Sequence, residues 1–192
     1  FIERIGAECE AYDIPFFLEF VGYDENGKGE KSLEYAKKKP AVVKGSMAEF
    51  SKPQYKVDVL KVEVPINPAY VEGSAAFKGG EFAYTKEEAL AHFRDAASVT
   101  TLPFIYLSAG VTNEVFIENL KFAAESGTDY SGVLCGRATW LDGVKIFGAQ
   151  GAAALEAWLL DQGGFGVFDP AINAFSILTQ ILHRPLKVES GD

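Results

Sequence analysis

A lysine inside an apolar strand pattern is the residue of this chain best suited to chemistry. Lys61 lies in the segment VDVLKVEVP, residues 57–65, whose aliphatic and β-branched side chains are typical of a buried strand. Burial disfavours the ammonium form, and a neutral amine can attack a ketone carbon and form a Schiff base. A lysine can also lay its stem along apolar surface and keep its charged end in water. The strand pattern alone favours this second interpretation.

Polar side chains stand at the ends of all four apolar runs of the chain. These are Glu19 in the first run, Lys61 and Glu63 late in the second, Ser108 after the third and Arg137 after the fourth. In parallel α/β proteins the carboxyl ends of the strands form the edge at which binding and catalytic residues gather. The agreement of four strands indicates one common site more strongly than any single residue does.

The chain alternates strand patterns with helix patterns. Apolar runs predict strands at 15–20, 57–64, 102–107 and 132–136. Helical patterns are expected at 1–12, 32–50, 113–126 and 143–162, and a further helix begins at Thr85.

Three local signals refine the helices. Thr85 and Glu88 have the spacing of a capping box, which starts a helix. Gly127 is a usual stop signal after a helix. Pro40 is a candidate break in the helix at 32–50, because proline lacks the N–H that a helix interior needs.

Apolar runs separated by helices predict an α/β fold in which helices cover parallel strands. The two candidate architectures are a doubly wound sheet and a (β/α)8 barrel. A complete barrel takes about 250 residues, so four strands correspond to half of one. We expect residues 1–192 to form a single domain of this kind.

The composition is that of an ordinary globular protein, with 48% hydrophobic and 23% charged residues. A net charge of −9 argues against a general nucleic-acid binder but leaves room for a small phosphorylated substrate. The sequence has neither a signal-peptide pattern nor an apolar run that predicts a membrane span, so we expect a cytoplasmic location. Because the chain begins at Phe1 and its only methionine is Met47, we also expect further residues upstream.

The spacing of the cysteines and histidines predicts neither a metal site nor a disulfide framework. Cys9 and Cys135 form no CxxC motif, and His92 and His183 lie far apart in the sequence. The GKG sequence at 27–29 lacks the full spacing of a phosphate-binding P-loop.

Four segments carry a resemblance to a known family. DVLKVEVP at 58–65, YLSAGV at 106–111 and GVLCGRATW at 132–140 resemble successive strand motifs of the tagatose 1,6-bisphosphate aldolases, class I enzymes of lactose and galactose catabolism. IPFFLE at 14–19 resembles the motif before them, and the likeness covers about residues 1–160. The enzymes resembled are (β/α)8 barrels, of which this chain would supply strands five to eight. Sulfosugar-phosphate aldolases share the Lys-Val-Glu and Gly-Arg-Ala motifs, but the DVL and LCG contexts fit the tagatose branch better.

The resemblance implies roles for the residues of the first two strands. Lys61 would form the Schiff base without a metal or another cofactor, and Glu19 would be the proton shuttle. We expect apolar neighbours to surround Glu19 and raise its pKa; the alternative is a solvated carboxylate at a strand end. Glu63 either pairs with Lys61 and tunes it, or belongs to a buried polar network.

The resemblance also implies that the last two strands bind the dihydroxyacetone phosphate end of a phosphorylated ketose. Backbone N–H groups near Gly110 and Gly136 would hold the phosphate, with Ser108 beside them and Arg137 adding charge, and Leu134 would lie near the substrate. The alternatives are a helix cap for Ser108 and a surface ion pair for Arg137.

The sequence departs from the family in two places. The loop at 74–80 looks longer than usual, and the tail at 163–192 diverges. The side chains that the family draws from strands one to four are also missing from this chain.

Three hypotheses follow. The chain is an aldolase for D-tagatose 1,6-bisphosphate, an aldolase for another phosphorylated ketose or sulfosugar phosphate, or a non-catalytic half-barrel. Since an open barrel edge exposes unpaired backbone groups, we expect a homo-oligomer or a complementing N-terminal half.

Overall fold

The structure is a computed structural model that describes residues 1–24, 29–134 and 136–159. Its centre is a parallel sheet with the strand order β1-β2-β3-β4. The strands are β1 (Phe17–Glu19), β2 (Val59–Glu63), β3 (Phe104–Leu107) and β4 (Gly132–Leu134). All four predicted strands are confirmed, each shorter than its apolar run.

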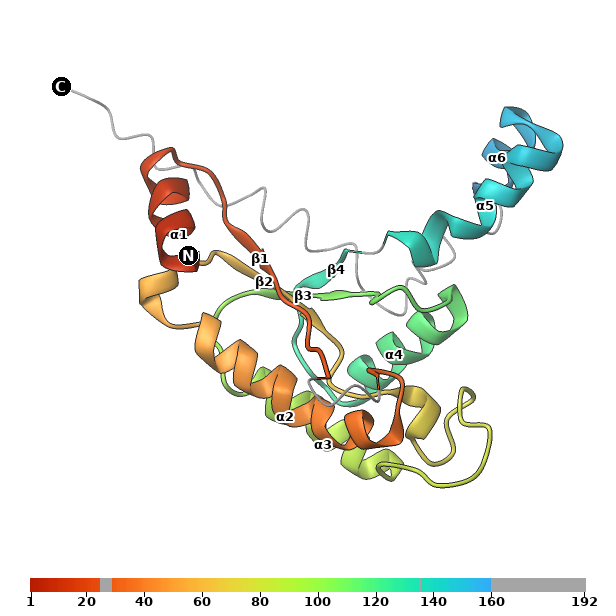
Figure 1. Ribbon diagram of the computed structural model, residues 1–192, viewed down its shortest axis with the longest axis horizontal. Helices are drawn as coiled ribbons and strands as arrows, with labels where there is room; N and C mark the ends of the chain where they lie inside the picture. Colours follow the sequence, from red (N-terminus) through yellow and green to blue (C-terminus); the bar gives the residue numbers. More distant parts are fainter. Residues whose placement is uncertain (25–28, 135, 160–192) are drawn as a thin grey trace.

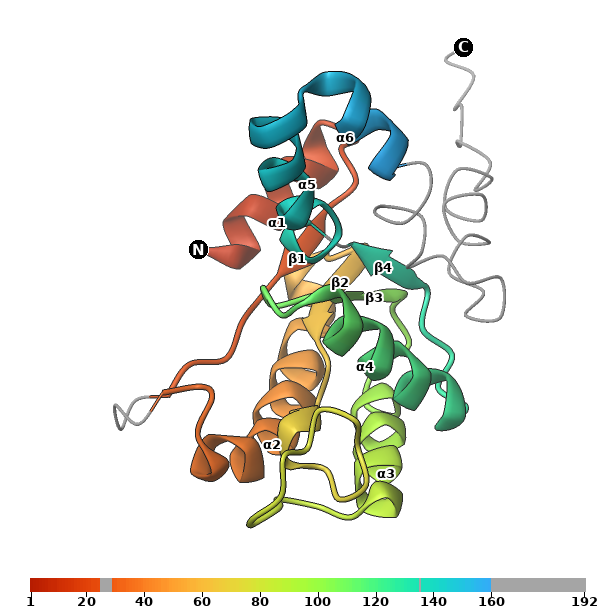
Figure 2. The same ribbon diagram turned by 90° about the vertical axis from the view of Figure 1, so that its right-hand side faces the viewer.

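Helices connect and flank the strands (Figure 1). They are α1 (Ile2–Ala11), α2 (Leu33–Phe50), α3 (Lys86–Ala97), α4 (Asn113–Glu125), α5 (Arg137–Gln150) and α6 (Ala152–Trp158), with short 3-10 turns η1 (Pro53–Tyr55) and η2 (Pro68–Tyr70). In both ribbon views α2, α3 and α4 lie side by side on one side of the sheet (Figures 1 and 2). Helix α6 packs on α5, and α5 also contacts α4.

The order of the strands distinguishes between the two candidate architectures. A doubly wound sheet reverses its strand order at a switch point and carries helices on both faces. Here the strands follow one another in chain order, and the helices after the first three strands share one side of the sheet. This arrangement fits the barrel type.

The core lies between the sheet and the helices that cover it. Its large, fully buried members come from the strands and from helices α2 to α4; they include Leu60, Val62, Tyr106, Met47, Phe93, Phe116 and Leu120. Apolar residues at helical spacing on each helix meet apolar residues of β2 and β3, which explains why these segments fold against each other.

The expectation that every strand is apolar and buried on both faces is wrong for β4, whose Leu134 is 49% exposed, and for β1. Its middle residue Leu18 is buried, but Phe17 is 42% exposed and Glu19 faces outward as well. The reason is position: in the described part of the chain β1 pairs with β2 alone and so forms an edge of the sheet.

Pro40 does not break α2, which runs unbroken from Leu33 to Phe50. Proline cannot donate to the carbonyl four residues earlier, and that carbonyl belongs to Ala36. The hydroxyl of Tyr84 donates to it instead, at 2.8 Å in the buried interior. A residue from the segment before α3 therefore satisfies the acceptor that Pro40 leaves open.

Two predicted helix signals are confirmed and one predicted helix is corrected. Thr85 and Glu88 form both bonds of the capping box of α3, and Gly127 follows α4 with a positive φ of 72°. The helix expected at 143–162 begins earlier, at Arg137, and is interrupted at Gly151, whose φ of 82° is incompatible with a continuing helix.

Candidate active site

The structure brings Lys61 and Glu19 into direct contact. They stand opposite each other in the register of β2 and β1, and Nζ of Lys61 lies 2.7 Å from Oε2 of Glu19. The lysine side chain is 16% exposed and the glutamate side chain 50% exposed. A shielded amine thus meets a carboxylate that remains accessible from outside.

This contact has the geometry of a proton-transfer pair. A catalytic acid or base must come within hydrogen-bond reach of the proton that it moves, and Glu19 satisfies this for the Lys61 amine. The sequence-based expectation of an apolar enclosure around Glu19 is wrong. Phe16 and Phe20 pack against the core, but Phe17 and Glu19 point outward from an edge strand.

Glu63 belongs to a buried network at the end of β2. Its carboxylate accepts a hydrogen bond from the backbone N–H of Gly22 at 2.8 Å and lies 3.5 Å from Nζ of Lys39 on α2. Both charged side chains are buried. Of the two alternatives for Glu63, the structure shows the buried network, with Lys39 as the paired lysine.

Burial lowers the pKa of Lys39 from its ordinary value, while the negative charge and hydrogen bonding of Glu63 act in the opposite direction. Lys39 is not among the residues predicted from the sequence. A signal was available, because Tyr35, Lys39, Val43 and Met47 recur every four residues and form the buried face of α2.

Tyr35 lies next to this network. Its hydroxyl is buried and has no hydrogen-bond partner within the described ranges. Burial, and then the negative charge of Glu63, raise the pKa of Tyr35 to about 12, so the phenol stays protonated. Gly22 approaches it closely: a Cβ there would lie 2.2 Å from Oη of Tyr35, which explains glycine at this position.

Ser108 and Gly110 form a tight turn after β3. Ser108 is buried, and its carbonyl accepts from the N–H of Val111 at 3.1 Å. Ala109 and Gly110 both have positive φ, of 50° and 69°. The alternative of Ser108 as a helix cap is wrong, because Thr112 is the N-cap of α4.

The predicted residues around β4 lie at a strand-to-helix junction. Leu134 ends β4 and is 49% exposed, Gly136 is the N-cap of α5, and Arg137 is the first residue of that helix. The side chain of Arg137 lies outside the described part of the structure, as do Cys135 and the tail at 163–192.

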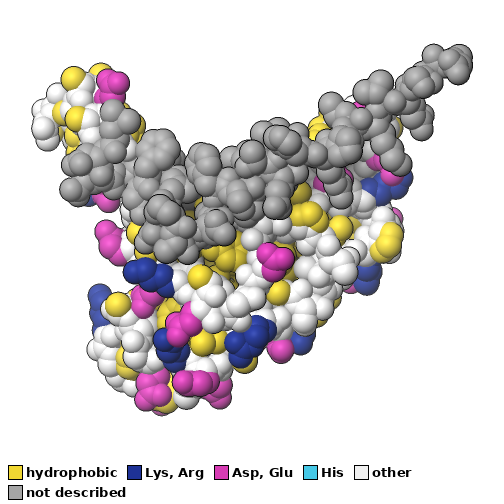
Figure 3. All heavy atoms as spheres, turned by 180° about the vertical axis from the view of Figure 1, so that it is seen from behind, with side chains coloured by type: hydrophobic (Ala, Val, Ile, Leu, Met, Phe, Trp, Pro, Cys, Tyr) yellow, Lys and Arg dark blue, Asp and Glu magenta, His cyan; other side chains and the backbone are white. Residues whose placement is uncertain are grey.

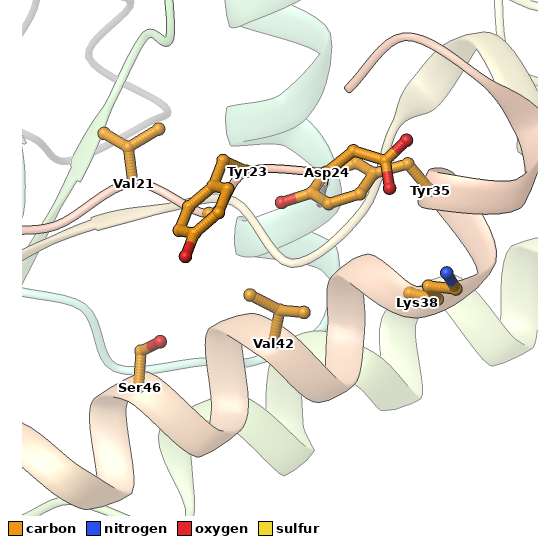
Figure 4. Close-up of a pocket in the computed structure, with 8 residues that line it drawn as sticks. Val21, Tyr23, Asp24, Tyr35, Lys38, Val42 and Ser46 are labelled. Atoms are coloured by element: carbon orange, nitrogen blue, oxygen red, sulfur yellow. The ribbon is translucent and has the colours of Figure 1, made fainter. Parts of the chain in front are cut away.

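A pocket of about 350 Å³ lies beside the Glu63 network rather than at Lys61 (Figure 4). Val21 and Tyr23, which follow β1, face Val42 and Ser46 of α2 across it. Gly22, Asp24, Tyr35 and Lys38 complete the lining. The chemistry of Lys61 and Glu19, not the presence of this cavity, identifies the candidate active site.

Comparison with known proteins gives the family. Residues 1–142 match the family described as DeoC/LacD family aldolase. The chain belongs to this family.

The relatives of this DeoC/LacD-family chain include curated aldolases. It is 59% identical over 163 residues to the tagatose 1,6-diphosphate aldolase of Listeria monocytogenes serotype 4a (strain HCC23), covering 85% of this chain and 47% of the relative. It is 56% identical to tagatose 1,6-diphosphate aldolase 2 of Enterococcus faecalis (strain ATCC 700802 / V583), covering 85% and 48%. The chain thus spans about half the length of the curated relatives that it matches.

Among solved structures, the chain is similar to a Schiff-base-forming fructose-1,6-bisphosphate aldolase, with a TM-score of 0.46 and 17% sequence identity. The match covers 81% of this chain and 48% of the chain of that aldolase.

Two further observations describe this aldolase-family chain. Across residues 1–24, 29–134 and 136–159, no group of three or more His, Cys, Asp or Glu residues is placed to hold a metal ion. In the same ranges no helix combines the length and hydropathy needed to cross a membrane.

The two histidines lie apart from the candidate site as far as the structure describes them. The ring of His92 contacts the ring of Tyr84, with the centroids 5.3 Å apart, and His183 lies outside the described residues.

Proposed function

We propose that this chain carries the Schiff-base part of a class I aldolase that cleaves D-tagatose 1,6-bisphosphate into dihydroxyacetone phosphate and glyceraldehyde 3-phosphate. The observation that carries the proposal is the 2.7 Å contact between Lys61 and Glu19 on neighbouring parallel strands. Identity of 55–59% to tagatose 1,6-diphosphate aldolases supports the choice of substrate.

In the proposed reaction Glu19 takes a proton from the Lys61 ammonium, and the resulting neutral amine attacks the ketone carbon C2 of the open-chain substrate. The carbinolamine takes up a proton from Glu19 and loses water, which leaves an iminium. Glu19 then accepts the C4 hydroxyl proton as the C3–C4 bond breaks, and the bond electrons move into the iminium to give an enamine. C4 becomes the aldehyde carbon of glyceraldehyde 3-phosphate, which leaves the site. Protonation of the enamine at C3 and hydrolysis release dihydroxyacetone phosphate and restore the lysine.

The remaining predicted residues are proposed to bind the dihydroxyacetone phosphate end. The turn at Ser108 and Gly110 and the start of α5 at Gly136 present backbone N–H groups, which suit an anion. Arg137 would add a positive charge, and Leu134 would contact the carbon skeleton.

The proposal extends to the architecture. The strands β1 to β4 would be strands five to eight of a (β/α)8 barrel, with residues 1–192 as one domain and the reaction in the cytoplasm. A complementing N-terminal half or a second copy of the chain would complete the site.

Borohydride trapping tests the proposal. Dihydroxyacetone phosphate and borohydride are added to the folded chain, and the reduced adduct is located by intact mass and peptide mapping. We expect an adduct at Lys61 that Lys61→Ala loses and that Lys86→Ala, a change at an exposed lysine, retains. Folded protein, verified by circular dichroism, that forms no adduct at Lys61 contradicts the proposal for this chain. A parallel panel of ketose bisphosphates and sulfosugar phosphates then separates the tagatose substrate from the alternatives.

A further inference from the structure

The Glu63 network joins the two segments that carry the proposed reacting pair. Glu63 lies two residues after Lys61, and Gly22, whose N–H it binds, lies three residues after Glu19. We infer that Glu63, paired with Lys39, is a positioning residue that holds Glu19 against Lys61. The inference rests on the proposed function, because it takes these two residues as the reacting pair.

The backbone pairing of the two strands ends close to the pair. The N–H of Phe20 donates to the carbonyl of Lys61 at 3.4 Å, and the chain then leaves the sheet. Beyond that point the 2.8 Å bond from Gly22 to the Glu63 side chain attaches the departing segment to the end of β2. Glu19 therefore lies in a closed ring of contacts: Lys61 to Glu19, along the chain to Gly22, and through Glu63 back to Lys61.

Lys39 makes this attachment compatible with a buried carboxylate. Glu63 is 7% exposed, and an unpaired carboxylate at such a position would take up a proton or move toward another cation. Lys39, itself buried on α2, lies 3.5 Å away and supplies the compensating charge. Glu63 thus accepts from the N–H of Gly22 while Lys39 compensates its charge, and Glu19 keeps its own contact with Lys61.

The close packing at Gly22 gives independent support. A Cβ at this position would lie 2.2 Å from Oη of Tyr35 and 2.9 Å from Cγ1 of Val42, both on α2. The segment after β1 therefore packs closely against α2 at Gly22, the residue whose N–H Glu63 binds. Gly22, Tyr35 and Val42 also line the pocket of Figure 4.

Variants in a Lys39→Met background separate positioning from stability. Replacing both charges by apolar side chains of similar volume leaves no unpaired buried charge, so we expect K39M/E63M to fold. In K39M/E63Q the side chain at position 63 is similar in size to that in K39M/E63M, but it keeps a carbonyl oxygen that can accept from the N–H of Gly22. The readout is the rate of trapped adduct formation at Lys61 as a function of dihydroxyacetone phosphate concentration.

Positioning predicts that K39M/E63M lowers the maximal trapping rate at least about tenfold, with the half-saturating concentration unchanged, and that K39M/E63Q recovers most of the rate. If Glu63 acted only through stability, K39M/E63Q would not regain the trapping rate while its urea midpoint equals that of K39M/E63M. A wild-type maximal rate in K39M/E63M, or no recovery in K39M/E63Q, overturns the inference. Asp95→Asn, which breaks the exposed pair of Lys44 on α2, is the control and should leave the rate unchanged.

Amide exchange provides a measurement that depends neither on catalysis nor on the double variants. In Glu63→Gln the acceptor of the Gly22 N–H is neutral and the bond weaker, so exchange in residues 20–24 should be several-fold faster than in wild type or Asp95→Asn. Equal exchange in all three proteins overturns the inference. If wild type forms no adduct at Lys61, the proposed function fails, and the exchange result still decides whether Glu63 holds this segment.

Discussion

At the level of single residues, the Lys61–Glu19 pair differs from the exposed ion pairs of the surface by its setting. Pairs such as Lys44–Asp95 are exposed on both sides and contribute little to stability. Lys61 is shielded, lies within β2 and stands opposite Glu19, the last residue of β1; α/β proteins place their chemistry at the carboxyl edge of the sheet. We therefore propose that this contact serves the proposed reaction rather than the stability of the fold.

Glu19→Gln tests the proton transfer. The amide keeps the size of the side chain and a hydrogen-bond acceptor for Lys61, but it cannot take a proton. We expect the rate of borohydride-trapped adduct formation to fall by about 10²–10⁴-fold, the usual contribution of a general acid–base group. Glu10→Gln, which alters an exposed ion pair with Lys56, is the control. A wild-type rate in Glu19→Gln would remove Glu19 from the mechanism.

The lowered pKa of His92 leads us to predict that the stability of the chain depends on pH. Burial lowers its pKa below the ordinary 6.5, against smaller effects of Asp95 and Glu88. The unfolded chain therefore binds this proton more readily, and stability is lost as the pH falls from about 6.5 through the folded-state pKa. His92→Gln should show a smaller decrease of the urea midpoint than wild type between about pH 7.5 and pH 5. Parallel decreases in the two proteins would contradict this prediction.

At the scale of elements, α2 is the helix that links the fold to the site. It carries Lys39 toward Glu63, packs Val43 and Met47 into the core and tolerates an internal proline. The proline is tolerated because Tyr84 donates to the carbonyl of Ala36. A single buried hydroxyl thus compensates for a missing helical hydrogen bond.

Tyr84→Phe should destabilise the chain by about 1–3 kcal/mol, because it leaves the buried Ala36 carbonyl without a donor. In a Pro40→Ala background the restored N–H of residue 40 can reach that carbonyl, so the same substitution should cost less. Urea unfolding of the four proteins measures the coupling. Tyr70→Phe, which removes an exposed bond to Lys31, is the matched control and should have a small effect. Equal costs of Tyr84→Phe in both backgrounds would rule out this compensation.

At the scale of the whole molecule, apolar side chains are exposed along the β1 edge. They are Ile14, Phe17, Val21 and Tyr23. On the face seen in Figure 3, acidic and basic side chains are interspersed over the lower part of the molecule rather than gathered into one charged field. Among the described residues β1 pairs with β2 alone, and an apolar edge beside strand backbone of this kind favours association through β1 over binding of a polyanion.

We therefore predict concentration-dependent self-association of the chain through β1. Phe17→Lys places a charge on this edge and should shift the chain toward the monomer, as measured by analytical ultracentrifugation. Phe82→Lys, at a comparably exposed aromatic residue in the loop before α3, should leave the association unchanged. Identical sedimentation of wild type and Phe17→Lys would exclude β1 as the interface.

The local structure and the chemical candidates could be predicted from the order of the residues alone. Runs of apolar residues gave the four strands, and the spacing of Thr85 and Glu88 gave a helix start, because both depend on residues near in sequence. Lys61 and Glu19 were candidates because their types and their places on strands suit proton transfer. Their direct contact follows from the parallel register of β1 and β2.

The partners of buried polar groups and the exposure of the sheet edge became known from the folded structure. Lys39 meets Glu63, and Tyr84 meets the Ala36 carbonyl, across long separations in the chain that no local pattern encodes. The outward position of Glu19 likewise depends on which strand lies beside β1. Burial and pairing are properties of packed neighbours, and packing brings together residues whose sequence signals are independent of one another.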